Sequence, residues 1–219
     1  MQDVYLWVSG PLAWAAWAIF ALGSIYKIWR TLETARQKDQ VQLNYISLKY
    51  GLRSILNWSI PFNTTNKRLH PVFTGVAFFF HIAFFALLFF VSAHVIMIEE
   101  GFGIGWFTIP DVVADIIAFA VIGACVFFGV RRVVRPEVNY VTDWTDYVLL
   151  ALVAAPFVTG VLAYHQLGNY MLMVVLHMLS AEVLLVAIPF TRLSHMLLAP
   201  LTRAYIGSEF GMVRHVKDW

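Results

Sequence analysis

The stretch LHMLSAEVLLVAIPFTRLSH, residues 176–195, places a histidine near each end of an almost wholly apolar segment. His177 and His195 are 18 residues apart. At ~100° per residue, an ideal α-helix would turn both side chains to one face, about 27 Å apart along the axis. The spacing therefore predicts one helix that offers an imidazole at two depths of a membrane.

The whole chain has the composition of a membrane protein. Of its 219 residues, 60% are hydrophobic and 13% are charged, and the mean hydropathy is +0.73. Soluble domains are about half apolar and about a quarter charged, so this composition excludes an ordinary soluble enzyme. The single cysteine, Cys125, excludes an internal disulfide and any CxxC motif, and we expect it to be a packing residue.

Apolar runs of about 20 residues are long enough to cross a bilayer. They predict an all-α fold, a five-helix transmembrane bundle in a single domain over residues 1–219. The N-terminal stretch lacks the basic region of a removable signal, so we expect its apolar run to be the first span. The predicted spans are 6–27, 72–98, 112–130, 147–165 and 170–191.

The distribution of basic residues predicts the orientation of the chain. All 15 lysines and arginines lie in or beside three segments, which are residues 28–71, 131–146 and the tail after 191. In a five-span chain these segments share one face of the membrane, and the positive-inside rule makes that face cytoplasmic. We therefore expect the N-terminus outside, the C-terminus inside, and a cytoplasmic loop over residues 28–71.

This cytoplasmic loop contains an amphipathic pattern. Apolar residues recur with basic residues between them, which predicts a helix that lies on the membrane surface or docks a cytoplasmic subunit. The sequence leaves both alternatives open. The recurring residues are Val41, Tyr45, Leu48, Leu52 and Leu56.

Two more histidines lie in the second predicted span, which runs antiparallel to the fifth. Their depths pair His81 with His195 on the inner side and His94 with His177 on the outer side. Histidine pairs from two helices are a common way to hold haem b without covalent bonds.

One geometric point opposes this pairing. His81 and His94 are 13 residues apart, so an ideal helix would turn them about 140° away from each other. His70 would share a face with His81 and is an alternative ligand, although it precedes Pro71 at the membrane edge.

Short motifs around these histidines resemble the gamma subunit family of respiratory nitrate reductase. The motifs are FFFHIAFF at 78–85, SAHVIM at 92–97, PFTRLSH at 189–195, and the pair Trp106 and Pro110 in the predicted outer loop. The family also includes small cytochrome b subunits of the Hmc- and Tmc-type membrane complexes of sulfate reducers, which this chain resembles most in size. The interval between His81 and His94 is about one turn longer than in the nitrate enzyme, and no lysine lies on the outer side, which suggests a different branch.

The resemblance implies two bis-histidine haem b groups, with ligands that map onto His81, His94, His177 and His195. Arg192 lies one turn before His195, so it is either a partner for the inner haem's propionates or a membrane-edge anchor. The implied partners are a cytoplasmic iron–sulfur subunit, a periplasmic multihaem cytochrome c, other membrane subunits and a quinone such as menaquinone, all at a bacterial or archaeal cytoplasmic membrane. Nothing indicates a nucleic acid partner.

Two functions remain open. The first is a cytochrome b subunit of a respiratory oxidoreductase, which carries electrons across the membrane between the quinone pool and partner haem or iron–sulfur subunits and is not catalytic alone. The second is a membrane anchor or transporter whose histidines bind a metal or relay protons without haem.

Other polar residues in or near the spans are candidates for supporting roles. His165 is either an interfacial residue or part of a quinone or proton path. Glu182 is either a neutral hydrogen-bonding group or a proton carrier. Three residues could line an outer quinol pocket, namely Tyr164, Glu99 and Glu100.

Overall fold

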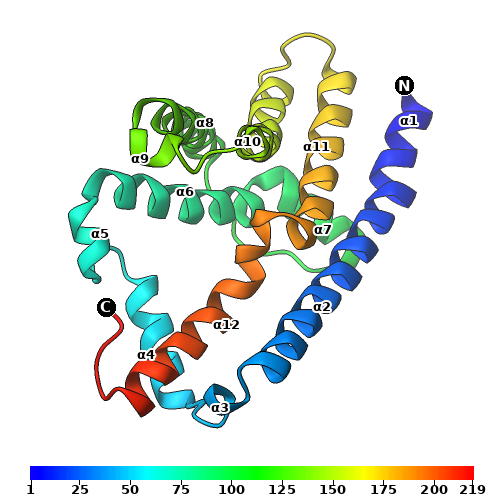
Figure 1. Cartoon of the computed structure of the whole chain (residues 1–219). Helices are drawn as coiled ribbons and strands as arrows, with labels where there is room; N and C mark the ends of the chain where they lie inside the picture. Colours follow the sequence, from blue (N-terminus) through cyan, green and yellow to red (C-terminus); the bar gives the residue numbers. More distant parts are fainter. The chain divides into compact units, whose positions relative to one another are not determined.

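A computed structural model describes all residues, 1–219, and contains helices and no strands (Figure 1). Five helical segments are long and apolar enough to cross a membrane. They are Gln2–Lys38 (α1, Gln2–Trp7; a π-turn, Val8–Leu12; and α2, Ala13–Lys38), Pro71–Phe90 (α6), Asp111–Val134 (α8), Trp144–Tyr164 (α10) and Tyr170–Phe190 (α11). The expected all-helical fold with five candidate membrane spans is confirmed.

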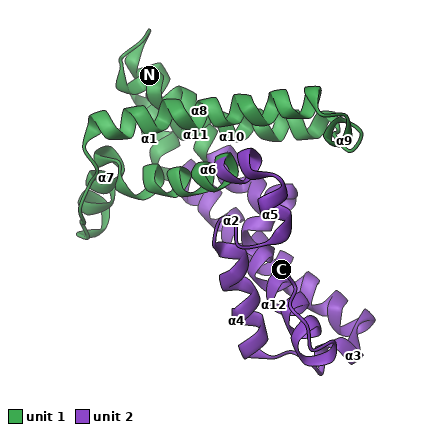
Figure 2. Cartoon of the chain, turned by 90° about the vertical axis from the view of Figure 1, so that its left-hand side faces the viewer, with its two compact units in different colours: residues 1–10, 76–181 green, residues 11–75, 182–219 purple.

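Shorter helices connect and follow these segments. They are α3 (Gln40–Leu43), α4 (Leu48–Ser59), α5 (Thr65–Leu69), α7 (Ser92–Phe102), α9 (Pro136–Asn139), a 3-10 turn (Arg192–Ser194), α12 (His195–Ser208) and a π-turn (Glu209–Val213). The chain divides into two compact units, which Figure 2 distinguishes by colour. Unit 1 comprises residues 1–10 and 76–181, and unit 2 comprises residues 11–75 and 182–219.

Unit 1 has its core where α6, α8 and α10 meet. The buried members of this core are small or aliphatic, and the rings of Phe80 and Phe157 pack beside them. Phe80 also contacts the ring of Phe128 edge-to-face, with centroids 5.7 Å apart. Edge-to-face contacts between aromatic rings add to the stabilisation from burial. The four buried residues are Ala83, Leu87, Ala114 and Val121.

The second predicted span, 72–98, is not one continuous helix. α6 ends at Phe90, Val91 takes an extended conformation with φ −69° and ψ 133°, and α7 begins at Ser92. The backbone N–H of Ile109 donates to the carbonyl oxygen of Phe90 at 2.9 Å. The continuous-helix expectation was wrong here because contacts from a distant loop stabilise the helix end.

The other carbonyl groups at the end of α6 are also satisfied. The last four carbonyls of any α-helix lack partners within the helix. Nδ1 of His94 donates to the carbonyl oxygens of Leu87 and Leu88 at 3.1 and 3.0 Å. Nε1 of Trp106 donates to the carbonyl oxygen of Phe89 at 2.6 Å. Two side chains, those of His94 and Trp106, therefore stabilise the end of α6 together with the backbone N–H of Ile109.

We expect Trp106→Phe to destabilise the protein by about 1 kcal/mol. Phenylalanine keeps an aromatic ring but has no N–H, so the carbonyl group of Phe89 loses its partner. A thermal unfolding scan in detergent would measure the change. Phe107→Leu is the control, because that exposed neighbour packs its ring on Phe90 and donates no hydrogen bond. If both variants unfolded at the same temperature as the wild type, the hydrogen bond from Trp106 would not contribute to stability.

The N-terminus of α10 is fixed by polar contacts between its first residues and α8. Asp143 and Asp146 form a capping box, in which the backbone N–H of Asp143 donates to Oδ2 of Asp146 at 3.0 Å. The buried Asp146 also lies 3.6 Å from the guanidinium of Arg132, in the last turn of α8. Because capping satisfies N–H groups that the helix cannot, these residues determine where α10 begins.

The fifth span ends earlier than the sequence argument required. α11 stops at Phe190, and Thr191 is extended with φ −123° and ψ −173°. The hydroxyl of Thr191 accepts a hydrogen bond from the N–H of Leu193 at 3.2 Å, which starts the 3-10 turn before α12. His195 therefore begins α12, in unit 2, while His177 lies on α11 in unit 1. The expectation that both histidines share one face of one helix was wrong.

In unit 2, α4 and α12 lie side by side (Figure 1). Ser47, which precedes α4, donates its backbone N–H to the hydroxyl of Ser208 at 3.1 Å. Gly207 allows the close approach, because a Cβ there would lie 2.7 Å from the carbonyl oxygen of Tyr50 and would overlap Ser54.

The face of α4 away from α12 exposes Leu48, Leu52 and Leu56. The expected amphipathic helix is confirmed over residues 48–59, whereas Val41 belongs to α3 and Tyr45 to the following turn.

We expect Gly207→Val to separate α4 from α12. The added side chain would overlap Ser54 and the Tyr50 carbonyl group, and overpacking of this kind costs about 1–3 kcal/mol. Trypsin should then cleave faster at Arg53 and Arg203, which lie on the two helices. The matched control is Gly123→Val on α8, where a Cβ has no neighbour within 4 Å. Equal cleavage rates in the two variants would contradict the packing described.

Candidate functional site

Unit 1 brings two of the predicted ligand histidines together. His94 lies on α7 and His177 lies on α11, and their ring centroids are 6.0 Å apart with ring planes 8° from parallel. Both side chains are half-buried. They are the two residues that the sequence paired at the predicted outer side of the membrane.

His177 is oriented by the backbone of α10. Its Nδ1 donates to the carbonyl oxygen of Pro156 at 2.8 Å, and the hydroxyl of Thr159 lies 3.4 Å from the same nitrogen. Because a carbonyl oxygen only accepts, this bond places the ring proton on Nδ1. In the neutral ring, Nε2 then carries a lone pair that can bind a metal.

His94 is also held through its Nδ1 by backbone carbonyl groups, which belong to α6. Its Nδ1 donates to the carbonyl oxygens of Leu87 and Leu88. These oxygens are available because α6 ends at Phe90. The helix break therefore also fixes the tautomer of His94 and leaves its Nε2 as the metal-binding nitrogen.

A glycine makes room for the His177 ring. A Cβ at Gly160, on α10, would lie 3.2 Å from Cε1 and 3.3 Å from Nδ1 of His177. These distances are shorter than ordinary van der Waals contacts, so a methyl group would require the ring to shift by a few tenths of an ångström and a larger side chain would displace it further. Gly160 is thus a positioning residue for the histidine pair.

The pair could supply two nitrogen ligands to one metal centre, such as a bis-histidine haem. The pair supplies two nitrogen donors, and no group of three or more His, Cys, Asp or Glu side chains forms a metal cluster in the chain. Two axial protein ligands are what a bis-histidine haem requires, because the macrocycle supplies the equatorial nitrogens.

The other two predicted ligands have similar local hydrogen bonds. Nδ1 of His81 donates to the carbonyl oxygen of Ala77 at 2.7 Å, and Nδ1 of His195 donates to that of Arg192 at 3.0 Å. Both side chains are exposed, and they belong to different units. Their pairing stays a prediction, as does the role of Arg192, which begins the 3-10 turn.

The alternative ligand His70 lies outside α6. It is the C-cap of α5, where its backbone carbonyl accepts from the N–H of Thr74 at 2.9 Å. The shared-face argument that linked it to His81 assumed one helix through both residues, and α6 begins only at Pro71. The backbone of His70, with φ −124° and ψ 63°, is not helical, and its role as an alternative ligand stays a prediction.

His165 has an acidic partner that the sequence reasoning missed. Its Nε2 lies 3.0 Å from both carboxylate oxygens of Asp115, on α8. The rings of Phe119 and Tyr164 also contact it, with centroids 6.1 and 5.1 Å away. Asp115 lies 50 residues earlier in the chain, so only the packing of α8 against α10 reveals the pair.

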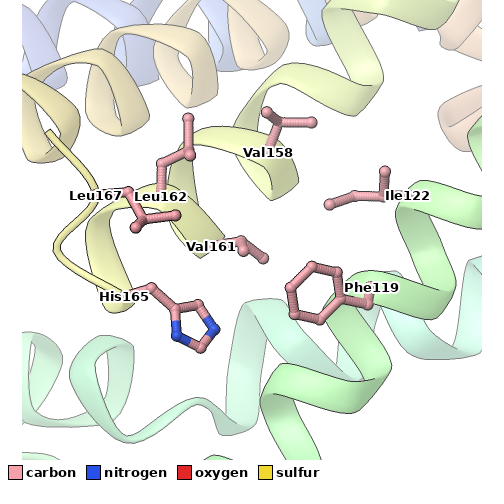
Figure 3. Close-up of a pocket in the computed structure, with 7 residues that line it drawn as sticks. All are labelled: Phe119, Ile122, Val158, Val161, Leu162, His165 and Leu167. Carbon is pink, nitrogen blue, oxygen red and sulfur yellow. The ribbon is translucent and has the colours of Figure 1, made fainter.

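Beside this hydrogen-bonded pair lies an apolar hollow of about 570 Å³ between α8 and α10 (Figure 3). The expected pocket residues Tyr164, Glu99 and Glu100 are not among those that line it. The lining consists of Phe119, Ile122, Val158, Val161, Leu162, His165 and Leu167.

Two other residues singled out in the sequence lie elsewhere. Cys125 is a buried free thiol in α8, consistent with a packing role. Glu182 lies in unit 2, and its Oε2 has no hydrogen-bond partner.

The features above define a class, an all-helical protein with five candidate membrane spans and a facing pair of histidines in one unit. The chain belongs to the family of a Nitratidesulfovibrio vulgaris (strain Hildenborough) protein whose name is simply "Protein". The two are 33% identical over 215 residues, which cover 96% of this chain and 95% of that protein. No family model matches the chain, and no solved structure matches it.

Proposed function

We propose that this chain is a two-haem cytochrome b subunit of a respiratory membrane oxidoreductase. It would carry electrons across the membrane between the quinone pool and partner haem or iron–sulfur subunits. The observation that supports the proposal best is the facing pair His94 and His177, in which both Nδ1 atoms donate to backbone carbonyls. Buried or half-buried imidazoles held in this way leave both Nε2 atoms available as ligands.

Four histidines of the chain would bind the two haem groups. His94 and His177 would bind the outer haem b, and His81 and His195 would bind the inner one. When bound, haem b supplies a one-electron couple whose potential depends on its ligands and their surroundings. The carbonyl groups of Leu87, Leu88 and Pro156 hold the outer imidazoles in one tautomer and increase their basicity.

The proposal includes an orientation. The N-terminus would be outside and the C-terminus inside, in a bacterial or archaeal cytoplasmic membrane, since the basic residues would then lie in the cytoplasm. The proposed partners are an iron–sulfur subunit on the cytoplasmic side, a periplasmic multihaem cytochrome c and other membrane subunits. The exposed leucines of α4 support a cytoplasmic docking surface or contact with lipid headgroups.

The experiment that tests the proposal is a reduced-minus-oxidised optical spectrum of the purified chain. A low-spin b-type spectrum with split α bands is the expected result, because two bis-histidine haems would differ in their surroundings. A colourless protein that binds a divalent metal, or none, would refute the proposal and favour the anchor or transporter.

A further inference from the structure

In unit 2, α2 and α12 run toward the same end, where α3 lies (Figure 1). α2 ends at Lys38, which is 11 residues beyond Lys27, the first basic residue of the chain. At ~1.5 Å per residue, α2 therefore extends about 16 Å past this membrane-edge residue. α12 contacts α2, and burial together with the nearby carboxylate of Asp39 raises the pKa of Tyr205, close to the end of α12. The end of α12 thus lies beside the end of α2 that is farthest from the membrane.

Helix α4 runs antiparallel to α12 and returns toward the membrane. Its start is joined to the far end of α12, because the backbone N–H of Ser47 donates to the hydroxyl of Ser208. Its end leads to Phe62, whose ring lies 3.9 Å from where a Cβ at Gly75 would be. Gly75 is in the second turn of α6, a candidate membrane span. The axis of α4 therefore points away from the membrane edge and does not lie along the membrane surface.

One face of α4 carries a row of exposed leucines. Leu48, Leu52 and Leu56 are 77%, 48% and 63% exposed, and their spacing of four residues places them within about 80° around the helix. The row is about 12 Å long. Val41 and Ile46, which precede α4 at the far end, are exposed as well. A bilayer surface would reach only the near end of this row, and apolar surface that water otherwise covers is typical of a protein interaction site.

The leucine row has a basic edge. α4 contains Lys49 and Arg53 and no acidic residue, and each of these cations follows a leucine of the row by one residue. The guanidinium of Arg53 is already engaged, since it lies 5.0 Å from the ring centroid of Trp219 and donates to the carbonyl oxygen of Val216 at 3.2 Å. Lys49 is exposed, so a partner meets its ammonium group at this edge. A carboxylate on the partner would complement that charge.

We propose that the leucine row of α4 docks a cytoplasmic protein that offers an apolar groove with carboxylate groups along its rim. Helices that bind grooves in this way present apolar anchors one turn apart on one face. The sequence leaves contact with the membrane surface open as an alternative, and the direction of α4 favours the protein partner. This inference rests on the orientation in the proposed function, which places α4 in the cytoplasm, and it does not require haem.

The test is photo-crosslinking of the full chain in the cells that produce it, with p-benzoylphenylalanine in place of Leu52. Irradiation should join the chain to one second protein, and mass spectrometry should locate Asp or Glu beside the crosslinked residue of that protein. Lys49→Glu should lower the crosslink yield at least fivefold, because it repels a carboxylate, whereas Lys49→Arg should keep the yield. The control places the same photoreactive residue at Gln37, which is exposed on the extension of α2, and should not give this crosslink.

Five results would overturn the inference. They are crosslinks to phospholipid only, crosslinks to a second copy of this chain, no crosslink from a correctly folded chain, an equal yield from Gln37, and an unchanged yield in Lys49→Glu. Circular dichroism of the purified variants verifies that they are folded.

The proposed function can fail separately. In a Cys125→Ser background, Gln37→Cys should react with a membrane-impermeant maleimide in inverted vesicles and not in intact cells. The opposite result would show that the proposed orientation is wrong, and it would overturn a cytoplasmic partner with it. A chain that gave the expected crosslink but contained no haem would refute the cytochrome and leave the docking surface in place.

Discussion

On the proposed function, replacing His177 with alanine will lower the haem content of the purified chain from the expected two haem b groups per chain to about one. The methyl group of alanine cannot bind iron, so the proposed outer haem would lose one of its two histidine ligands. His94→Ala should have the same effect. The double variant should lose no more than either single variant, because the two residues serve one site.

The control for this prediction is His165→Ala. His165 is also a histidine of unit 1, but its side chain is exposed and its Nε2 is hydrogen-bonded to Asp115. This variant should keep both haem groups. If His177→Ala retained the full haem content and a low-spin spectrum, His177 would not be a ligand.

Gly160→Leu should have the second largest effect, although Gly160 binds nothing itself. A Cβ at this position already lies 3.2 Å from the ring of His177, and a leucine would displace the ring from the Pro156 carbonyl and from His94. We expect the outer haem to be lost or to change to a high-spin form with one histidine ligand. Absorbance and electron paramagnetic resonance spectra would measure both outcomes.

Gly123→Leu is a matched control on α8. It introduces the same residue into a membrane-spanning helix where a Cβ has no neighbour within 4 Å. This variant should keep the spectrum of the wild type. If both leucine variants lost haem equally, the cause would be general destabilisation and not the space beside His177.

The sequence predicts the five spans well because their apolar runs have the length of a bilayer crossing. Each observed span overlaps its prediction, with ends that differ by several residues and most of all at Lys38. The break at Val91 was not predictable, since neither Gly nor Pro marks it. It depends on hydrogen bonds from Trp106 and Ile109, which come from a loop that follows in the chain. α11 ends where the hydroxyl of Thr191 accepts a hydrogen bond from the N–H of Leu193. The spacing of apolar residues along the sequence does not predict this bond.

The candidate site was predictable in part. Depth in the membrane alone pairs His94 with His177, and the structure places these rings together. The angular objection assumed a continuous helix from His81 to His94, and the break at Val91 removes that assumption. Gly160 and Asp115 were missed because their roles depend on which helix faces which. A single sequence does not show which helices pack against each other, so it predicts neither the contact of α10 with α11 nor that of α8 with α10.

The proposed function is tested most directly by the haem content of the purified wild-type chain, measured as the pyridine haemochrome and divided by the protein concentration. We expect about two haem b groups per chain, held without covalent bonds and therefore extractable by acid acetone. A chain purified in folded form from haem-replete cells with no haem would contradict it.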